Sequence, residues 1–309
     1  MGLALGLAAA VIGRRTRSGH GRIPVFGRNN PMIGTISSPL VVLGATGTLG
    51  ERVVAQAVAE RRPVIAVARD AGALEHLAAR HAGLATLVAD IATEADAAAL
   101  AARLHAWPDG PPGAVVAAIR GAAQGGRVLA APADFLRRRL DEDLIPHLVA
   151  ARHLLPVLAR QARASYVLIG GPGAEQPWAG YGHHSIGAAA LRMLARVLHE
   201  EARTLPVRVQ MLAVDTPARS AANAGHACMQ WPDADAIASH ALRLVAGAVA
   251  GHAALVRFPL GALSRPPGLS DDLDVGPPPC PSDTNHTDDA RALLRRISVD
   301  VPAPQEFRP

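Results

Sequence analysis

The sequence predicts a single α/β domain built on a doubly wound parallel sheet of about seven strands. Short apolar runs alternate with segments of helical spacing along most of the chain. This alternation is typical of parallel strands joined by crossover helices. Of the 309 residues, 50% are hydrophobic but only 3% are aromatic, so we expect a large core built mainly from alanine, valine and leucine.

The first predicted strand is the apolar run PLVVLG. It ends in glycine and is typical of a buried strand. Similar runs and helical segments then alternate. The strands are expected at 39–44, 63–69, 84–90 and 113–119, and the helices at 51–60, 71–81 and 94–106. Right-handed crossovers between these strands would place helices on both faces of the sheet.

The second half continues the pattern with two long helices. One is expected over 133–162, bent at Pro146 because proline lacks the N–H that an inner helical turn needs. The other is expected over 184–203. The remaining strands are expected at 164–171, 207–214 and 253–259, and a last helix at 233–249.

The two ends of the chain differ in composition from the middle. Residues 1–36 are predicted to be a disordered extension, residues 37–260 the folded domain, and residues 261–309 a disordered tail rich in proline, serine and aspartate. The apolar run Gly2–Gly13 is much shorter than the about 20 residues that a membrane helix needs. We therefore expect no membrane partner.

The charge pattern gives little reason to expect a nucleic-acid partner. The net charge is +5 and its basic part is entirely arginine, because the chain contains no lysine. The run Arg137–Arg139 is expected on a solvated or subunit-facing helix face, since no aromatic residues are interleaved with it. The two distant cysteines, Cys228 and Cys280, form neither a disulfide framework nor a zinc spacing. The default expectation is a reducing cytoplasm and no metal.

A glycine-rich turn follows the first expected strand. In GATGTLG, Gly44, Gly47 and Gly50 lie between that strand and the next helix. Glycines let a backbone approach a pyrophosphate closely, and the free N–H groups at the start of the helix then bind its negative charge. A glycine triplet alone is weak evidence, but its place in the first strand–helix–strand unit predicts a dinucleotide site.

The residues after the second and third strands bear on which dinucleotide is bound. Arg69 stands where an acid would favour NAD, and an arginine there can pair with the 2′-phosphate of NADP. Asp70 follows it, so NADP is only slightly favoured over NAD. Asp90 is expected to contact the adenine edge, to be the N-cap of the next helix, or to do both. The expected cofactor contacts are Gly44, Thr46, Gly47, Thr48, Leu49, Gly50, Arg69, Asp90 and Ile91.

With these motifs, residues 39–258 resemble the short-chain dehydrogenase/reductase superfamily. The similarity lies in the glycine spacing, the ADI after the third strand, and the segment YGHHSIGAAAL. The resemblance implies a Rossmann-like fold that binds NAD(P). It also implies a homodimer or homotetramer that associates through the two long helices.

The four catalytic positions of that superfamily are all changed. Its Asn, Ser, Tyr and Lys correspond by the resemblance to Asp143, Gly171, His184 and Ala188. The resemblance assigns proton transfer to the Tyr and the support of that Tyr to the Lys. A chain without lysine cannot supply this pair. The neighbouring His183 and His184 point in different directions on a helix, so a metal site is not expected there.

Two functions remain open at this point. The chain could be a divergent oxidoreductase of an unknown small carbonyl or alcohol, with His184 as general acid supported by Asp143, since histidine titrates near neutral pH. Alternatively, it could be a catalytically silent dinucleotide-binding sensor, regulator or scaffold. Arg120 could reach an anionic substrate or the pyrophosphate, or it could lie at the surface.

Overall fold

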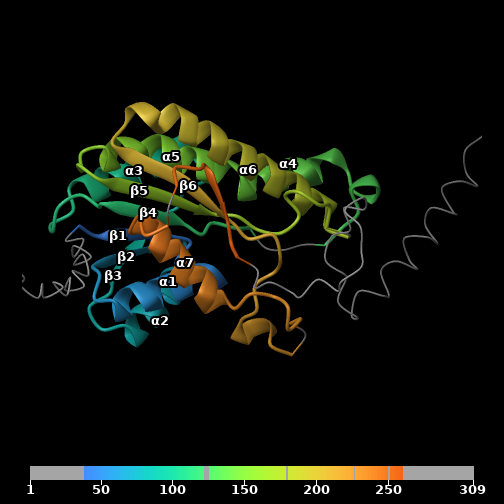
Figure 1. Ribbon diagram of the computed structural model, residues 1–309, viewed down its shortest axis with the longest axis horizontal. Helices are drawn as coiled ribbons and strands as arrows, with labels where there is room; N and C mark the ends of the chain where they lie inside the picture. The colour runs from blue at the N-terminus through green and yellow to red at the C-terminus, as the bar shows by residue number, and fades with distance from the viewer. Residues whose placement is uncertain (1–37, 122–124, 179, 226, 250, 260–309) are drawn as a thin grey trace, which may run out of the picture. The chain divides into compact units, whose positions relative to one another are not determined.

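The computed structural model describes residues 38–259, except for residues 122–124, 179, 226 and 250. All adjacent strands pair in parallel, in the order β3-β2-β1-β4-β5-β6-β7 (Figure 1). The predicted α/β fold with about seven parallel strands is confirmed. The strands are β1 Leu40–Leu43, β2 Val64–Ala68, β3 Ala85–Val88, β4 Ala114–Ala117, β5 Ala164–Ile169, β6 Val207–Ala213 and β7 Leu255–Arg257.

Helices cover both faces of this sheet. The helices are α1 Thr48–Ala59, α2 Ala71–Arg80, α3 Glu94–His105, α4 Ala133–Asp143, α5 Ile145–Leu158, α6 Gly182–Glu201 and α7 Ala234–Val245. In Figure 1, α3, α4, α5 and α6 lie above the sheet, and α1, α2 and α7 lie below it. Short 3-10 helices occur at Val128–Ala130, Ala202–Thr204 and Ala221–Asn223.

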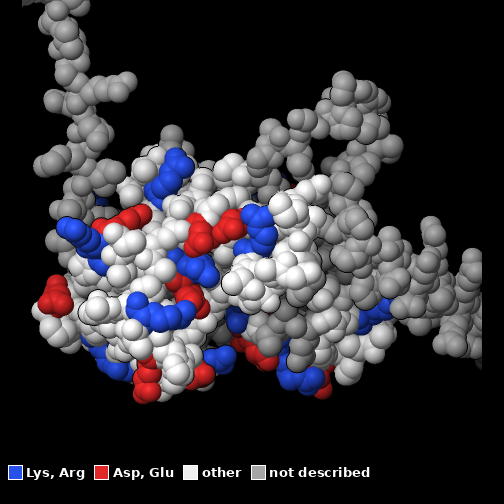
Figure 2. Space-filling view, turned by 90° about the horizontal axis from the view of Figure 1, so that it is seen from below, with Lys and Arg blue, Asp and Glu red and all other residues white. Residues whose placement is uncertain are grey.

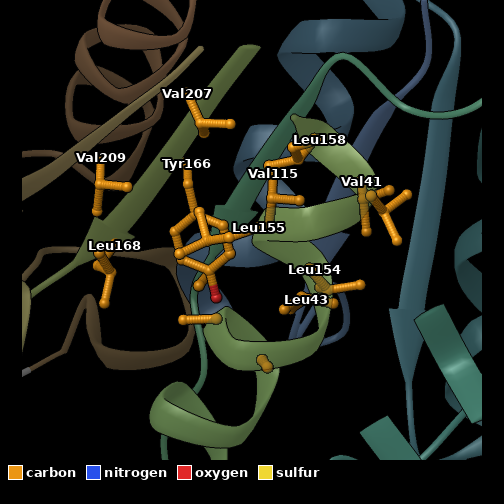
Figure 3. Close-up of a cluster of buried hydrophobic side chains, with 14 of the residues drawn as sticks. Val41, Leu43, Val115, Leu154, Leu155, Leu158, Tyr166, Leu168, Val207 and Val209 are labelled. Atoms are coloured by element: carbon orange, nitrogen blue, oxygen red, sulfur yellow. The ribbon is translucent and has the colours of Figure 1, made fainter. Parts of the chain in front are cut away.

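Side chains that alternate along each strand enter two separate cores. In β1, Val41 and Leu43 pack with α3, α5 and α6, whereas Leu40 and Val42 pack with α1, α2 and α7. This two-residue period is the reason that a short strand can join both cores. The residues labelled in the view of the first core are mostly valine and leucine (Figure 3).

Tyr166 is the one aromatic residue labelled within that core (Figure 3). Its side chain is fully buried in β5, and its hydroxyl has no hydrogen-bond partner among the described residues. Burial raises the pKa of the Tyr166 phenol above its ordinary value. The hydroxyl is therefore protonated and enclosed, so Tyr166 is a core residue.

The expected long helix over 133–162 is two helices. α4 ends at Asp143, α5 begins at Ile145, and Leu144 between them has φ −113° and ψ −53°. Pro146 lies in the first turn of α5, where the missing N–H costs nothing because it would have no partner in the helix. The proline therefore starts a new helix instead of bending a continuous one.

The face formed by α1, α2 and α7 carries charges of both signs. Acidic and basic side chains are interspersed across the view from below (Figure 2). Arg80 pairs with Glu51 at 2.6 Å and joins α2 to α1, while Arg52 lies 3.8 Å from Asp235 on α7. Such exposed pairs each contribute little to stability.

The predicted extension 1–36 and tail 261–309 lie outside the described residues. Of the helices in the described part of the chain, none is long and apolar enough to cross a membrane. Cys228 forms a disulfide, which the sequence did not predict. Disulfides are uncommon in a reducing cytoplasm, so this bond does not support the predicted cytoplasmic location. The location stays a prediction.

Candidate functional site

The glycine turn is shaped by close contacts that leave no space for side chains. Gly44 has φ +72°, and a Cβ there would lie 2.5 Å from the carbonyl oxygen of Ala118. A Cβ on Gly50 would lie 2.1 Å from the carbonyl oxygen of Gly44. Gly44 therefore packs against the end of β4, and Gly50 packs α1 against the turn itself.

The start of α1 is open to an anion. Its N-cap is Gly47, which has no side chain to cap the helix. The first N–H groups of a helix have no partner within it, and they lie at the positive end of the helix dipole. Gly47 and Thr48 are exposed, while Thr46 and Leu49 are half-buried. The turn thus presents backbone donors without a competing side chain, as a pyrophosphate site requires.

The ends of β2 and β3 carry the residues expected at the adenosine side. Arg69 is exposed directly after β2. Asp70 is the N-cap of α2, and its carboxylate accepts from the N–H of Ala73 at 3.0 Å. One oxygen of Asp70 is therefore engaged in capping α2, and Arg69 forms no ion pair with the described residues.

Asp90 is not a helix N-cap, contrary to one of the two expectations for it. The N-cap of α3 is Thr93, whose hydroxyl accepts from the N–H of Asp96. Asp90 instead accepts from the N–H groups of Ile91, at 2.7 Å, and Ala92, at 3.2 Å. Because Thr93 already caps the helix, the exposed Asp90 holds the turn after β3 and keeps a carboxylate oxygen free there.

The segment Ile119–Gly121 follows β4, and side chains from two helices hydrogen-bond to its backbone. The Nε2 of His147, on α5, lies 3.1 Å from the carbonyl oxygen of Ile119 and donates to it. The Oδ1 of Asp143, on α4, accepts from the N–H of Gly121 at 2.7 Å. Burial lowers the pKa of His147 to about 4, so this imidazole is neutral.

Asp143 also forms a buried ion pair. Its Oδ2 accepts from the Nη2 of Arg139 at 2.8 Å, and both side chains are buried. Arg139 additionally pairs with Glu142 at 2.6 Å. Neither Arg139 nor His147 was predicted from the sequence to belong to the site. The spacing of Arg139 and Asp143, four residues apart on a helix, is a signal that would have found the ion pair.

His184 is buried at the start of α6 and bonded to Arg120. Its Nε2 lies 2.9 Å from Arg120 Nη2. A guanidinium can only donate, so Nε2 accepts and the proton of the neutral ring is on Nδ1. The ring also hydrogen-bonds the carbonyl of Pro172.

The protonation state of His184 differs from the sequence-based expectation of titration near neutral pH. Burial, followed by the charge of Arg120, lowers the pKa of His184 to about 4. The ring is therefore neutral at pH 7. In this arrangement its one proton is on the nitrogen that does not face Arg120.

Gly171, the expected Ser position, adjoins this pair, whereas Gly187, the neighbour of the expected Lys position, faces Asp143. A Cβ on Gly171 would lie 3.6 Å from Arg120 Nη1 and 3.8 Å from His184 Nε2. A Cβ on Gly187, beside Ala188 on α6, would lie 3.9 Å from the Cβ of Asp143. The structure therefore brings Asp143, Gly171 and His184, the positions expected to correspond to Asn, Ser and Tyr, close to Arg120 or to the backbone beside it.

Aromatic side chains surround the two histidines. Trp178 stacks on Tyr181 at 4.3 Å and meets the His184 ring edge-on at 5.9 Å. His183 points toward α4, where its ring lies 4.6 Å from that of Phe135. The described residues contain no group of His, Cys, Asp and Glu that could hold a metal ion.

A cavity of about 490 Å³ lies elsewhere, between α6 and β7. Its lining includes Arg192, whose guanidinium pairs with Glu175 and Asp215, and Arg257, which pairs with the same two carboxylates. None of the sequence-predicted site residues lines it. The paired charges join the segments after β5 and β6 to β7.

These features define a class of protein, a doubly wound α/β protein with a nucleotide-type glycine turn at the end of its first strand. A family model described as short chain dehydrogenase matches residues 39–226. The chain therefore belongs to the short-chain dehydrogenase family. A comparison with curated proteins finds no match.

Solved structures of similar fold come from several bacteria. A short-chain type dehydrogenase/reductase from Mycobacterium ulcerans is 21% identical, with TM-score 0.61 over 71% of this chain and 87% of that one. A Pseudomonas aeruginosa PAO1 short-chain oxidoreductase described as containing an atypical catalytic center is 18% identical, with TM-score 0.64 over 74% and 98%. A Sphingobium yanoikuyae short-chain dehydrogenase in complex with NADPH is 21% identical, with TM-score 0.58 over 87% and 98%.

Proposed function

We propose that this protein binds an NAD(P) dinucleotide, with the pyrophosphate on the turn Gly44–Gly50. The observation that carries the proposal is the uncapped start of α1 beside Gly44 and Gly50, where a Cβ would clash with backbone atoms. Membership of the short-chain dehydrogenase family supports it. So does the likeness in fold to the Sphingobium yanoikuyae protein, which was solved with NADPH.

The backbone of Thr46, Thr48 and Leu49 would contact the pyrophosphate beside the three glycines. Asp90 and Ile91, after β3, would lie against the adenine. Arg69, exposed after β2, would pair with a 2′-phosphate, which favours NADP slightly over NAD.

The substitution Gly47→Asp tests the dinucleotide site without removing the helix start. Aspartate is a favoured N-cap, and a Cβ at this position has only one close contact, at 3.3 Å to the Gly44 carbonyl oxygen. We expect stability to be unchanged or slightly raised. NADPH binding should weaken at least about tenfold, because the new carboxylate takes the place of the pyrophosphate and repels it. Calorimetric titration of the full chain measures this.

Ala133→Asp is the matched control, because it adds the same charge to the exposed start of α4. It should leave the NADPH affinity within about twofold of the parent, a difference of less than ~0.5 kcal/mol. Equal affinity in Gly47→Asp and the parent would contradict the proposed site. Absence of binding of both NADPH and NADH to the parent protein would contradict the proposed function itself.

Arg69→Asp tests the preference between the two nucleotides. The change removes a cation that would face the 2′-phosphate and places an acid where it can bond the ribose hydroxyls. NADPH binding should weaken by roughly ten- to a hundredfold, as expected for a lost charged hydrogen bond of about 1.5–3 kcal/mol. NADH binding should hold or improve. An unchanged ratio of the two affinities, measured side by side, would remove Arg69 from this role.

Of the two functions left open by the sequence, the geometry favours a dinucleotide-binding sensor, regulator or scaffold over a divergent oxidoreductase. A general acid must present a proton to the substrate, whereas the Nε2 of His184 accepts from Arg120 and its pKa is about 4. Ala188 also cannot hold the ribose as a lysine would. Steady NADPH consumption with small carbonyl substrates would instead favour the oxidoreductase, with His184 and Asp143 as its catalytic residues.

We also propose a homodimer or homotetramer that associates through α5 and α6. On α6, Ile186, Met193 and Val197 are 40%, 55% and 43% exposed, and Leu148 on α5 is 41% exposed. Residues at this spacing share one face of a helix. Light scattering on the full chain gives the molar mass, and a monomer at micromolar concentration would contradict the proposal.

A further inference from the structure

Three of the four positions expected to correspond to the catalytic residues lie at Arg120: His184 bonds it, Gly171 adjoins it, and Asp143 bonds the backbone next to it. We propose that Arg120 binds the carboxylate group of a small molecule beside the dinucleotide. The inference rests on the proposed dinucleotide site for its location, and it names the chemical class of the second ligand of that site.

The backbone of Arg120 is fixed on both sides. His147 donates to the carbonyl oxygen of Ile119 at 3.1 Å, and Asp143 accepts from the N–H of Gly121 at 2.7 Å. Both residues are buried: His147 is 0% exposed and Asp143 is 7% exposed. The position expected to correspond to the family's Asn therefore holds the segment that carries the arginine.

The side chain of Arg120 is oriented by the other two positions. His184, at the expected Tyr position, accepts from Nη2 at 2.9 Å. Gly171, at the expected Ser position, has no side chain, and a Cβ there would already lie 3.6 Å from Nη1. A serine hydroxyl would extend further toward the guanidinium, so glycine leaves the space that the arginine uses.

The charge of Arg120 has no carboxylate bonded to it in the described part of the chain. The nearby Asp143 is engaged by Arg139 and by Gly121, and the hydrogen-bond partner of Arg120 is the neutral ring of His184. Arg120 is exposed as a residue, so a ligand can reach it. Its guanidinium nevertheless adjoins His184 and Gly171, and partial burial lowers the pKa of Arg120 from its ordinary value.

A carboxylate satisfies these conditions. A guanidinium has five N–H donors in a planar fork, and one nitrogen is engaged by His184. The fork matches a carboxylate in two parallel hydrogen bonds, which are stronger than bonds between neutral groups. A ligand anion would also neutralise a charge to which the described residues bond no carboxylate, in partly desolvated surroundings.

The pyrophosphate of the dinucleotide is the other anion near this site. The glycine turn contacts the residues before Arg120, since a Cβ on Gly44 would lie 3.4 Å from the Cα of Ile119. The guanidinium, however, bonds His184 on α6 and adjoins Gly171 after β5. β4 separates β5 from β1 in the sheet. The side chain thus reaches away from the pyrophosphate turn, which favours a separate ligand.

The test compares three carboxylates with their neutral amides: acetate with acetamide, pyruvate with pyruvamide, and benzoate with benzamide. Binding to the full-length protein is measured by calorimetry, both alone and saturated with NADP⁺. At least one carboxylate should bind about tenfold or more tightly than its amide. In Arg120→Gln, which keeps an amide donor without the charge, that preference should fall below about twofold. Arg127→Gln, another single-charge removal, should keep it.

The outcomes separate this inference from the proposed function. NADPH affinity should change less than about threefold in Arg120→Gln. A tenfold loss of NADPH affinity with no carboxylate preference in the parent would assign Arg120 to the pyrophosphate and overturn the inference. Equal binding of acid and amide in all three pairs, or a preference that survives in Arg120→Gln, would also overturn it. The measurements without NADP⁺ stand even if no dinucleotide binds.

Discussion

Replacing Asp143 with alanine is expected to lower the free energy of unfolding by about 3–5 kcal/mol, the usual loss when one partner of a buried ion pair is removed. The substitution leaves Arg139, whose residue is 4% exposed, without the carboxylate that lies 2.8 Å from its Nη2. It also removes the acceptor of the Gly121 N–H. Urea unfolding followed by circular dichroism measures the change.

The same helix offers a matched control. Asp134 pairs with Arg137 on α4, but these side chains are 69% and 74% exposed. Asp134→Ala should therefore cost less than about 1 kcal/mol. Similar losses in the two variants would mean that burial does not decide the strength of the Asp143 pair. Glu142 remains near Arg139 at 2.6 Å, so a loss at the lower end of the range would indicate partial compensation.

The sheet and the glycine turn could be predicted because their signals are local. The strand runs are short, apolar and regularly spaced, and the three glycines lie within seven residues. The break between α4 and α5 was also signalled by Pro146, but a proline fits both a bend and a new first turn. Which of these occurs depends on packing, which the local sequence does not contain.

The cap of α3 was a missed local signal. Thr93 is followed three residues later by Asp96, and the two are mutually hydrogen-bonded, with the hydroxyl of Thr93 accepting from the N–H of Asp96. This is close to a capping box. Reading that pattern would have placed the N-cap on Thr93 and left Asp90 in the preceding turn.

The chemistry of the altered site could not be predicted in the same way. Arg120 and His184 are 64 residues apart in the chain, and no local pattern announces their contact. The low pKa of His184 depends on burial and on the arginine, both of which are tertiary effects. The sequence therefore pointed to these positions, and the structure shows that His184 bonds Arg120 while Asp143 holds Gly121 and Arg139.

Gly50→Ala is expected to destabilise the protein by roughly 3 kcal/mol, at the upper end of the usual cost of overpacking. Alanine is a better helix former than glycine by about 1 kcal/mol, and Gly50 lies within α1, so propensity alone predicts the opposite sign. The new Cβ would lie 2.1 Å from the carbonyl oxygen and 2.8 Å from the carbonyl carbon of Gly44. These are backbone atoms that no side-chain rotation can move away.

Gly72→Ala in α2 separates propensity from contact. Gly72 is an exposed helical glycine, and a Cβ there meets only the Asp70 carboxylate at 3.5 Å, an ordinary contact. It should gain up to about 1 kcal/mol in thermal or urea unfolding. If Gly50→Ala gained a similar amount, α1 would not pack on the turn as closely as described. Since the Gly44 carbonyl must move to admit the methyl group, NADPH binding by the folded variant should weaken together with stability, which links the packing of α1 to the proposed pyrophosphate site.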